Sequence, residues 1–217
     1  MSPCCPAFCS ATERQFNERV AARDLRRYRE KGPGVTTRLL RDGVRAHAPR
    51  ASTLLDVGAG IGALTFELLD AGIHSAVAVD ASPAYVAAGR AEATRRGSDH
   101  RVQWTHGDFV SVANTLSPAD AVTLDRVVCC YPAFEELLAR AARHALCCLA
   151  LAYPRDRWYV RGLLAALNLA LMLRRTAFRT FLHPPRAMEE MVRAEGFRLA
   201  SRQTTVVWCA DVYVRAV

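Results

Sequence analysis

The sequence lacks several features that mark whole classes of protein. Its first residues do not combine a charged start with a long apolar run of the kind that directs secretion, so we expect a cytoplasmic protein. The apolar segment at residues 162–173 is too short to span a bilayer. Lysine is almost absent, because Lys31 is the single lysine among 29 basic residues. The net charge of +8 therefore comes from arginine and indicates compositional bias more than a selected binding surface.

A complete zinc-binding pattern is also missing, although the chain has eight cysteines. Cys4, Cys5 and Cys9 lie close together, but no His or Cys set elsewhere completes a tetrahedral site, so we expect no metal there. Without a secretion signal we expect reduced thiols. The other cysteines are expected in the core, at Cys147, Cys148 and Cys209, or beside a pocket after a strand, at Cys129 and Cys130.

What the chain does contain is an apolar strand that runs directly into a glycine turn and a helical pattern, over residues 54–64. Gly58 and Gly60 have no Cβ, so they can adopt positive φ and let the backbone approach a ligand closely. Gly62 lets the following helix pack near the strand. This arrangement of strand, turn and helix predicts a nucleoside-binding site in a parallel sheet.

Acidic side chains follow the later strands of the pattern. Asp80 ends an apolar segment about 20 residues past the first glycine, where ribose hydroxyls are usually held. Asp108 and Asp125 follow two further apolar segments. Because the carboxyl ends of parallel strands border one crevice, we expect these carboxylates to lie together. The glycines also fit the relaxed dinucleotide pattern, which leaves a nicotinamide-dependent oxidoreductase as an alternative.

Asp56 before the glycine turn, together with the Gly107-Asp108-Phe109 segment, resembles the class I S-adenosylmethionine-dependent methyltransferases. The likeness covers residues 52–153, and its D-x-G-x-G-x-G pattern is more specific than a lone glycine motif. It implies an enzyme that uses S-adenosylmethionine as cofactor. The cofactor-binding residues that it implies are Asp56, Gly58, Ala59, Gly60, Gly62, Asp80, Ala81, Asp108, Phe109, Asp125 and Arg126.

The resemblance also implies separate roles for the carboxylates. Asp56 and the glycine turn would hold the methionine part of the cofactor, and Asp80 would accept both ribose hydroxyls. Asp108 would accept a hydrogen bond from the adenine amino group, with the Phe109 amide and ring beside the base. Asp125 and Arg126 would lie near the methionine part of the cofactor. Structural roles stay open, because Asp56 can satisfy turn amides, Asp108 can form an Asx turn and Asp80 can start the next helix.

The alternation of helical and strand patterns predicts a Rossmann-like, doubly wound α/β fold. N-terminal helices, the first at residues 11–30, precede the first strand. The last two β-rich segments, at 197–207 and 208–214, are nearly contiguous and predict a hairpin. In the methyltransferases that the chain resembles, a mostly parallel seven-stranded sheet ends with an antiparallel last strand. We therefore expect that sheet here, with a cover helix.

Two regions are expected in the chain. Residues 1–50 would form an N-terminal tail and helical lid, and residues 51–217 the cofactor-binding domain, with a helical insertion at about 155–180. Tyr28 and Lys31 would close over the cofactor carboxylate, or they would simply end a surface helix.

The insertion contains a helix over residues 158–175, whose centre at 162–173 is apolar nearly all round and has arginines on both flanks. Such a helix can cover the substrate pocket, form a dimer contact or lie at a membrane interface. We favour the cover over the pocket. The sequence leaves the oligomeric state undetermined.

Candidate acceptor-site residues follow the fourth and fifth strands. His183 and Tyr131 are the candidate catalytic groups, since a general base helps where the acceptor has a proton to lose. Tyr153, Arg155 and Arg157 are the candidate substrate-binding groups, because two guanidinium groups can fix a carboxylate. A packing role for His183 and a pocket-wall role for both tyrosines remain open.

We expect a small-molecule methyl acceptor and no nucleic acid. Amino-group DNA and RNA methyltransferases carry Asn or Asp, Pro-Pro and an aromatic residue after the fourth strand, and residues 125–132 lack this motif. No RNA-binding module is recognisable. The segment at Tyr131 and the loop at His183 also resemble, more loosely, the magnesium-protoporphyrin O-methyltransferases. A noncatalytic S-adenosylmethionine-binding module, or one with peripheral membrane contact, is a further alternative.

Overall fold

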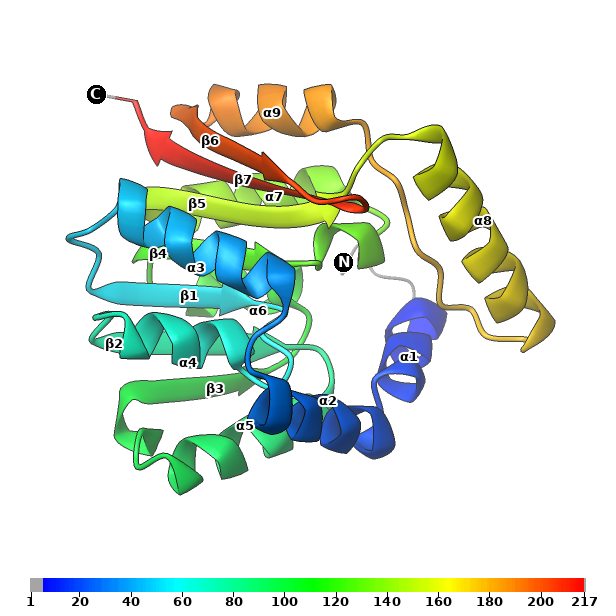
Figure 1. Cartoon of the computed structure of the whole chain (residues 1–217), viewed down its shortest axis with the longest axis horizontal. Helices are drawn as coiled ribbons and strands as arrows, with labels where there is room; N and C mark the ends of the chain where they lie inside the picture. The colour runs from blue at the N-terminus through cyan, green and yellow to red at the C-terminus, as the bar shows by residue number, and fades with distance from the viewer. Residues whose placement is uncertain (1–5, 217) are drawn as a thin grey trace.

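The computed structural model describes residues 6–216, and of residues 6–10 it describes only the backbone. Cys4 and Cys5 and the side chain of Cys9, for which no metal was expected, therefore lie outside the described part. The described chain forms a seven-stranded sheet with the order β3-β2-β1-β4-β5-β7-β6 (Figure 1). Its strands are β1 (Thr53–Val57), β2 (Ser75–Asp80), β3 (Val102–His106), β4 (Ala119–Asp125), β5 (Ala145–Pro154), β6 (Phe197–Thr204) and β7 (Trp208–Arg215).

The pairing of the strands confirms the predicted topology. β1 lies inside the sheet and pairs in parallel with β2 and β4, while β3 and β5 extend the parallel part. β7 runs antiparallel to both β5 and β6. The carboxyl ends of β1 to β5 consequently point to one edge of the sheet, which we call the carboxyl edge.

Helices cover both faces of the sheet, as the alternating pattern predicts. The α-helices are α1 (Pro6–Gln15), α2 (Glu18–Lys31), α3 (Val35–His47), α4 (Ala63–Asp70), α5 (Pro83–Arg95), α6 (Phe109–Val112), α7 (Phe134–His144), α8 (Trp158–Leu173) and α9 (Pro185–Ala194). Three short 3-10 turns are η1 (Asp99–Arg101), η2 (Ala113–Thr115) and η3 (Val128–Cys130). Neighbouring strand residues alternate between two apolar cores: Leu54 packs with α2 to α5, and Leu55 packs with α6, α7 and α9.

The N-terminal helical segment differs from the prediction, because the expected helix at 11–30 is two helices. Asn17 separates them in an extended conformation, and its side chain accepts hydrogen bonds from the amides of Arg19 and Val20. This is an N-cap, which satisfies amides that the first turn of α2 leaves without a helical partner. The break lets α1 leave the line of α2 and lie beyond the carboxyl edge (Figure 1).

One core expectation is wrong. Cys148 and Cys209 are buried as expected, but Cys147 is exposed. Ala119 pairs with Ala145 and Ala121 with Cys148, so β5 contains one extra residue between these two pairs. Such a bulge interrupts the alternation of side chains, and here it turns two successive residues of β5 outward.

Candidate functional site

The glycine turn lies across the end of β2, at the carboxyl edge. Gly58, Gly60 and Gly62 all have positive φ, at 65°, 58° and 82°. The amides of Gly58 and Ala59 donate hydrogen bonds to the carbonyl of Val79, at 2.8 and 3.1 Å. Main-chain bonds therefore fix a turn that other residue types adopt only with strain.

The three glycines face different surroundings. A Cβ at Gly58 would lie 2.4 Å from a methyl of Val127, and one at Gly62 would lie 2.6 Å from the Trp104 ring. Both of these glycines therefore allow close packing within the protein. A Cβ at Gly60 would meet nothing within 4 Å among the described residues. Gly60 is thus the place where the turn offers bare backbone to a ligand.

Asp56 lies beneath this turn and does not line the crevice. The side chain is buried, and its two oxygens accept hydrogen bonds of 2.7 Å from the hydroxyls of Thr65 on α4 and Thr123 on β4. Burial raises the pKa of Asp56 to about 6, against the opposing effect of the two hydroxyls. The geometry therefore favours a positioning role over the predicted direct contact. Sequence reasoning missed both threonines, although Thr123 stands out as a polar residue in an apolar strand.

Asp80 occupies the place that the sequence predicts. Its carboxylate accepts hydrogen bonds from the Gly60 and Ser82 amides, both at 2.8 Å. Burial raises the pKa of the carboxyl, and these two amides oppose that effect. Each carboxylate oxygen can accept more than one hydrogen bond, so capacity remains for hydroxyl donors. The next residue, Ala81, places its carbonyl 3.1 Å from Nε2 of His106.

Asp108 lies at the carboxyl edge beside β3, with a neighbouring side chain from the η3 region. It accepts hydrogen bonds from the Ser111 hydroxyl at 2.9 Å and the Tyr131 hydroxyl at 3.3 Å. The structure therefore brings Tyr131 to Asp108. The Phe109 ring is buried and packs edge-on against His144, so it does not lie beside the crevice as predicted.

The end of β4 carries a strained residue. Arg126 has φ of 64°, which is uncommon outside glycine and is frequent at functional sites. Its guanidinium is half exposed, 3.3 Å from the Asp125 carboxylate and 6.0 Å from the centre of the Trp208 ring. Asp125 also accepts a 2.6 Å hydrogen bond from Thr37 on α3, a contact between residues far apart along the chain that local patterns do not predict. Arg126 is therefore the more accessible of the two predicted residues.

His183 ties two loops together. Its Nε2 lies 3.1 Å from the carbonyl of Val128 and 3.0 Å from that of Tyr131, so this nitrogen carries the proton and donates. The ring packs against Phe134 and Phe181, at centroid distances of 4.4 and 5.8 Å. Burial lowers the pKa of the imidazole. These contacts favour the packing role of His183, in which it holds the two loops in position, over the predicted role as general base.

The predicted substrate-binding residues do not meet at one place. Tyr153 is buried and donates a 2.7 Å hydrogen bond to Asp211, which is also bound by Arg202 and Tyr213. Arg155 donates to the carbonyl of Thr205 in the β6–β7 turn. Arg157 alone is exposed, before α8. The expected pair of guanidinium groups is therefore not formed, because Arg155 stabilises a turn.

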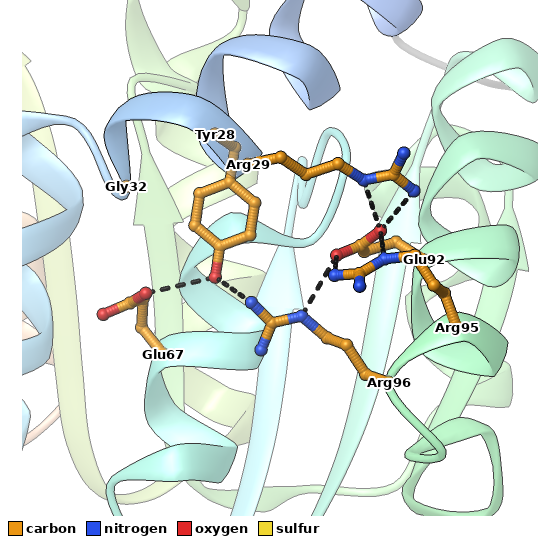
Figure 2. Close-up of a pocket in the computed structure, with 7 residues that line it drawn as sticks. All are labelled: Tyr28, Arg29, Gly32, Glu67, Glu92, Arg95 and Arg96. Carbon is orange, nitrogen blue, oxygen red and sulfur yellow. Dashed lines mark hydrogen bonds and ion pairs between the residues drawn. The ribbon is translucent and has the colours of Figure 1, made fainter.

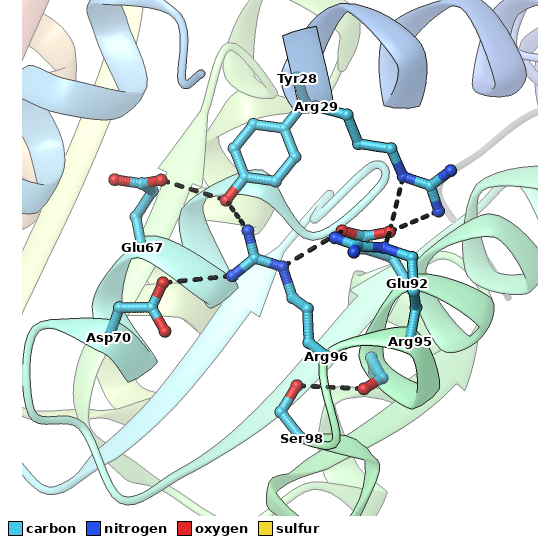
Figure 3. A network of polar contacts seen from close by, with 9 residues as sticks. Tyr28, Arg29, Glu67, Asp70, Glu92, Arg95, Arg96 and Ser98 are labelled. Carbon is cyan, nitrogen blue, oxygen red and sulfur yellow. Dashed lines mark hydrogen bonds and ion pairs between the residues drawn. The ribbon is translucent and has the colours of Figure 1, made fainter. Parts of the chain in front are cut away.

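Tyr28 and Lys31 do not reach the glycine turn either. The Tyr28 hydroxyl lies 3.1 Å from Glu67 and 2.9 Å from Arg96 (Figure 2). Lys31 is exposed. Beside them Glu92 is fully buried and accepts hydrogen bonds from three arginines, which lower its pKa to about 2 (Figure 3). Tyr28 thus belongs to a polar network that holds α2 against α4 and α5. The three arginines are Arg29, Arg95 and Arg96.

Helix α1 and the residue after it lie beyond the carboxyl edge (Figure 1). The Ser82 hydroxyl, just beyond β2, donates a 2.6 Å hydrogen bond to the carbonyl of Phe16. The Phe16 ring packs against Tyr85 and, edge-on, against Phe178. A small apolar cluster continues from there: it joins α1, the end of α8, the segment after α8 and Cys130 of η3. The segments that meet beyond the carboxyl edge therefore come from three distant parts of the chain.

Comparison with known proteins agrees with this geometry. The family model described as a methyltransferase domain matches residues 54–146, from β1 to the start of β5. No curated protein matches the sequence. The fold is similar to that of magnesium protoporphyrin IX methyltransferase from Synechocystis PCC 6803, solved with bound S-adenosylhomocysteine. The TM-score is 0.75 with 17% identity, over 95% of this chain and 99% of that one.

Two further solved structures are longer than this chain. An O-methyltransferase family protein from Burkholderia thailandensis gives a TM-score of 0.73 at 20% identity, over 93% of this chain and 62% of that one. An O-methyltransferase family 2 protein from Planctomyces limnophilus, in complex with apigenin, gives 0.70 at 18% identity, over 92% and 62%. The chain thus spans under two thirds of either protein. At these identities the likeness establishes the fold.

The buried Asp56 predicts a specific pH dependence of stability. The folded-state pKa of about 6 lies above the ordinary value, so the folded protein holds this proton over a range in which the unfolded chain has lost it. The contribution of this proton to the free energy of unfolding is full below the ordinary pKa, at about 4, and is lost as pH rises past about 6. Asp56→Asn cannot ionise, and its amide can still bond both threonines. Relative to this variant, the wild type should lose about 3 kcal/mol of unfolding free energy between about pH 3 and pH 7, measured by urea denaturation.

Asp120→Asn is the matched control, at the opposite end of the same strand pair. Asp120 accepts hydrogen bonds from the amides of Ser52 and Thr53, which lower its pKa. Its contribution to the unfolding free energy therefore changes with pH in the opposite direction to that of Asp56. Its contribution is present above the ordinary pKa and is lost as pH falls. Wild-type and Asp56→Asn stability curves that run parallel from pH 4 to 7 would contradict the assignment.

Proposed function

Because the chain is a class I S-adenosylmethionine-dependent methyltransferase, we propose that it methylates a small, largely apolar molecule at a carboxylate or hydroxyl oxygen. The observation that carries this proposal is the apolar cluster beyond the carboxyl edge. Ala11, Leu171 and Phe178 are buried there, with Phe16 and Cys130 packed against them. A site bordered by the protein's own apolar segments suits a compact, apolar acceptor better than a nucleic acid duplex.

The residues present fit the cofactor. Gly60 offers open space beside its backbone, and Asp80 is held by two amides with acceptor capacity left for ribose hydroxyls. Asp108 would bind the adenine amino group. When bound, the cofactor supplies a methyl group on a sulfonium, which is transferred by in-line displacement. The half-exposed Arg126 guanidinium suits a carboxylate on either the cofactor or the acceptor.

The chain's own contribution is to hold the reacting groups in line and to exclude water. His183 joins the 181–183 segment to η3 through two carbonyls, and the Phe181 amide adds a 2.7 Å hydrogen bond to the Cys129 carbonyl. These contacts fix the loops that border the acceptor side. An acceptor carboxylate is already deprotonated near neutral pH, so it needs no general base.

Gly60→Ala and Gly97→Ala form a matched pair that tests cofactor binding. Both glycines have positive φ, at 58° and 66°, and a Cβ at either meets nothing within 4 Å in the described part of the chain. Each substitution should therefore cost about 1 kcal/mol of backbone strain. Calorimetric titration with S-adenosylhomocysteine should show at least tenfold weaker binding for Gly60→Ala and unchanged binding for Gly97→Ala. Equal affinities would place the cofactor elsewhere, and binding of NADH instead would favour an oxidoreductase.

Two substitutions of His183 separate positioning from base catalysis. Glutamine places an N–H group near the position of Nε2 but cannot act as a base, whereas alanine removes both functions. We expect His183→Gln to keep kcat within about threefold and His183→Ala to lose about tenfold, as for one buried hydrogen bond. The assay is methyl transfer from labelled S-adenosylmethionine to the best substrate in a panel of aromatic carboxylates and phenols. Equal losses for both variants would assign the base role to His183, and no turnover with the whole panel would favour a noncatalytic binding module.

A further inference from the structure

α8 packs on the protein along only one narrow face. Val160 and Leu171 are its buried residues, and Asn168, on the same face, exchanges 2.8 Å hydrogen bonds with the backbone of Thr180. These positions recur at helical spacing. Figure 1 shows α8 at the periphery, beyond the carboxyl ends of the strands. The helix is thus anchored on one side and open on the rest of its circumference.

The open side of α8 is apolar. Leu163, Leu167, Leu169 and Met172 are each 43–54% exposed, and Leu173 is 74% exposed. Trp158, 83% exposed, begins the helix, and an aromatic residue of this kind is typical of a membrane–water interface. This contrasts with the predicted cover helix, whose apolar side chains would face the pocket. An exposed apolar surface of this extent is unusual on a protein that is in contact with water alone.

Charge distribution indicates what covers the open side. Residues 157–188 contain six arginines and no Asp or Glu. Arg157 and Arg161 lie at one end of α8, Arg174 and Arg175 at the other, and all four are exposed. Arg161 is the one with an ion pair among these four in the described residues, to Asp156 at 2.7 Å. Both ends of the apolar side are therefore positively charged.

We propose that the open side of α8 lies in the interface of an anionic lipid membrane. The helix has 16 residues, and none of the helices within residues 6–216 is long and apolar enough to cross a membrane. Leucines and Trp158 enter the boundary between headgroups and acyl chains, and the arginines at the ends bind lipid phosphates. A second copy fits less well, because pairing two such helices would bring arginines together without acidic partners in this segment.

Vesicle binding tests the proposal with the purified full chain. Vesicles of phosphatidylglycerol and phosphatidylcholine should co-sediment the protein and shift Trp158 fluorescence to shorter wavelength, and vesicles of phosphatidylcholine alone should bind far less. Leu167→Glu should weaken binding at least tenfold, and Arg174→Gln about fivefold. The controls are Leu146→Glu and Arg198→Gln, at exposed positions near the amino ends of the strands, which should bind as the wild type does.

Three results would overturn the proposal. The first is no binding to anionic vesicles by a folded wild type. The second is equal binding by Leu167→Glu and Leu146→Glu, which would mean nonspecific charge attraction. The third is a dimer in solution that Leu167→Glu dissociates, together with no vesicle binding, which would assign the side to a second copy. The vesicle experiment requires neither cofactor nor acceptor, so its outcome is independent of the proposed methyl transfer.

Discussion

The buried Asp56 carboxylate is the constraint on which the rest of the site depends. It joins the end of β1 to α4 through Thr65 and to β4 through Thr123. The glycine turn is the connection between β1 and α4, so these two hydrogen bonds set where the turn begins and where it ends. With the turn in place, the Gly60 amide meets Asp80 at 2.8 Å, and the end of β2 is joined to the same structure. A carboxylate that never reaches the crevice thus determines which backbone groups do.

The N-terminal helices depend on a second buried carboxylate. Glu92 on α5 is fully buried, and Arg29 donates to it from α2 with distances of 2.9 and 2.6 Å. Tyr85 adds a 2.7 Å hydrogen bond to Asp24, also on α2. With α2 held in this way, the N-cap at Asn17 directs α1 across the carboxyl edge. Stability in the helical layer and coverage of the proposed acceptor site are therefore linked through one helix.

Much of the fold could be predicted from the sequence, because the spacing of apolar residues and glycines is a local property. The positions of Gly60 and Asp80 followed from that spacing. The orientations of polar side chains did not, since they depend on partners far along the chain. Tyr153 turns inward because its hydroxyl donates to Asp211 on β7, two residues past its register partner Cys209. The bulge that exposes Cys147 arises from a one-residue mismatch between β4 and β5, which periodicity within one strand cannot reveal. The open side of α8 was equally hidden, because apolar composition does not say whether a helix packs.

Hydrogen exchange of the whole chain with and without S-adenosylhomocysteine tests the central claim most directly. Besides the carboxyl edge, a ligand could enter the depression lined by Tyr28, Glu92 and Arg96 between α2, α4 and α5. If the glycine turn and Asp80 hold the cofactor, the ligand should slow exchange at residues 58–62 and 80–82, and leave residues 92–97 unchanged. Slower exchange confined to residues 28–32 and 92–97, or no change at the glycine turn under saturating ligand, would contradict the account.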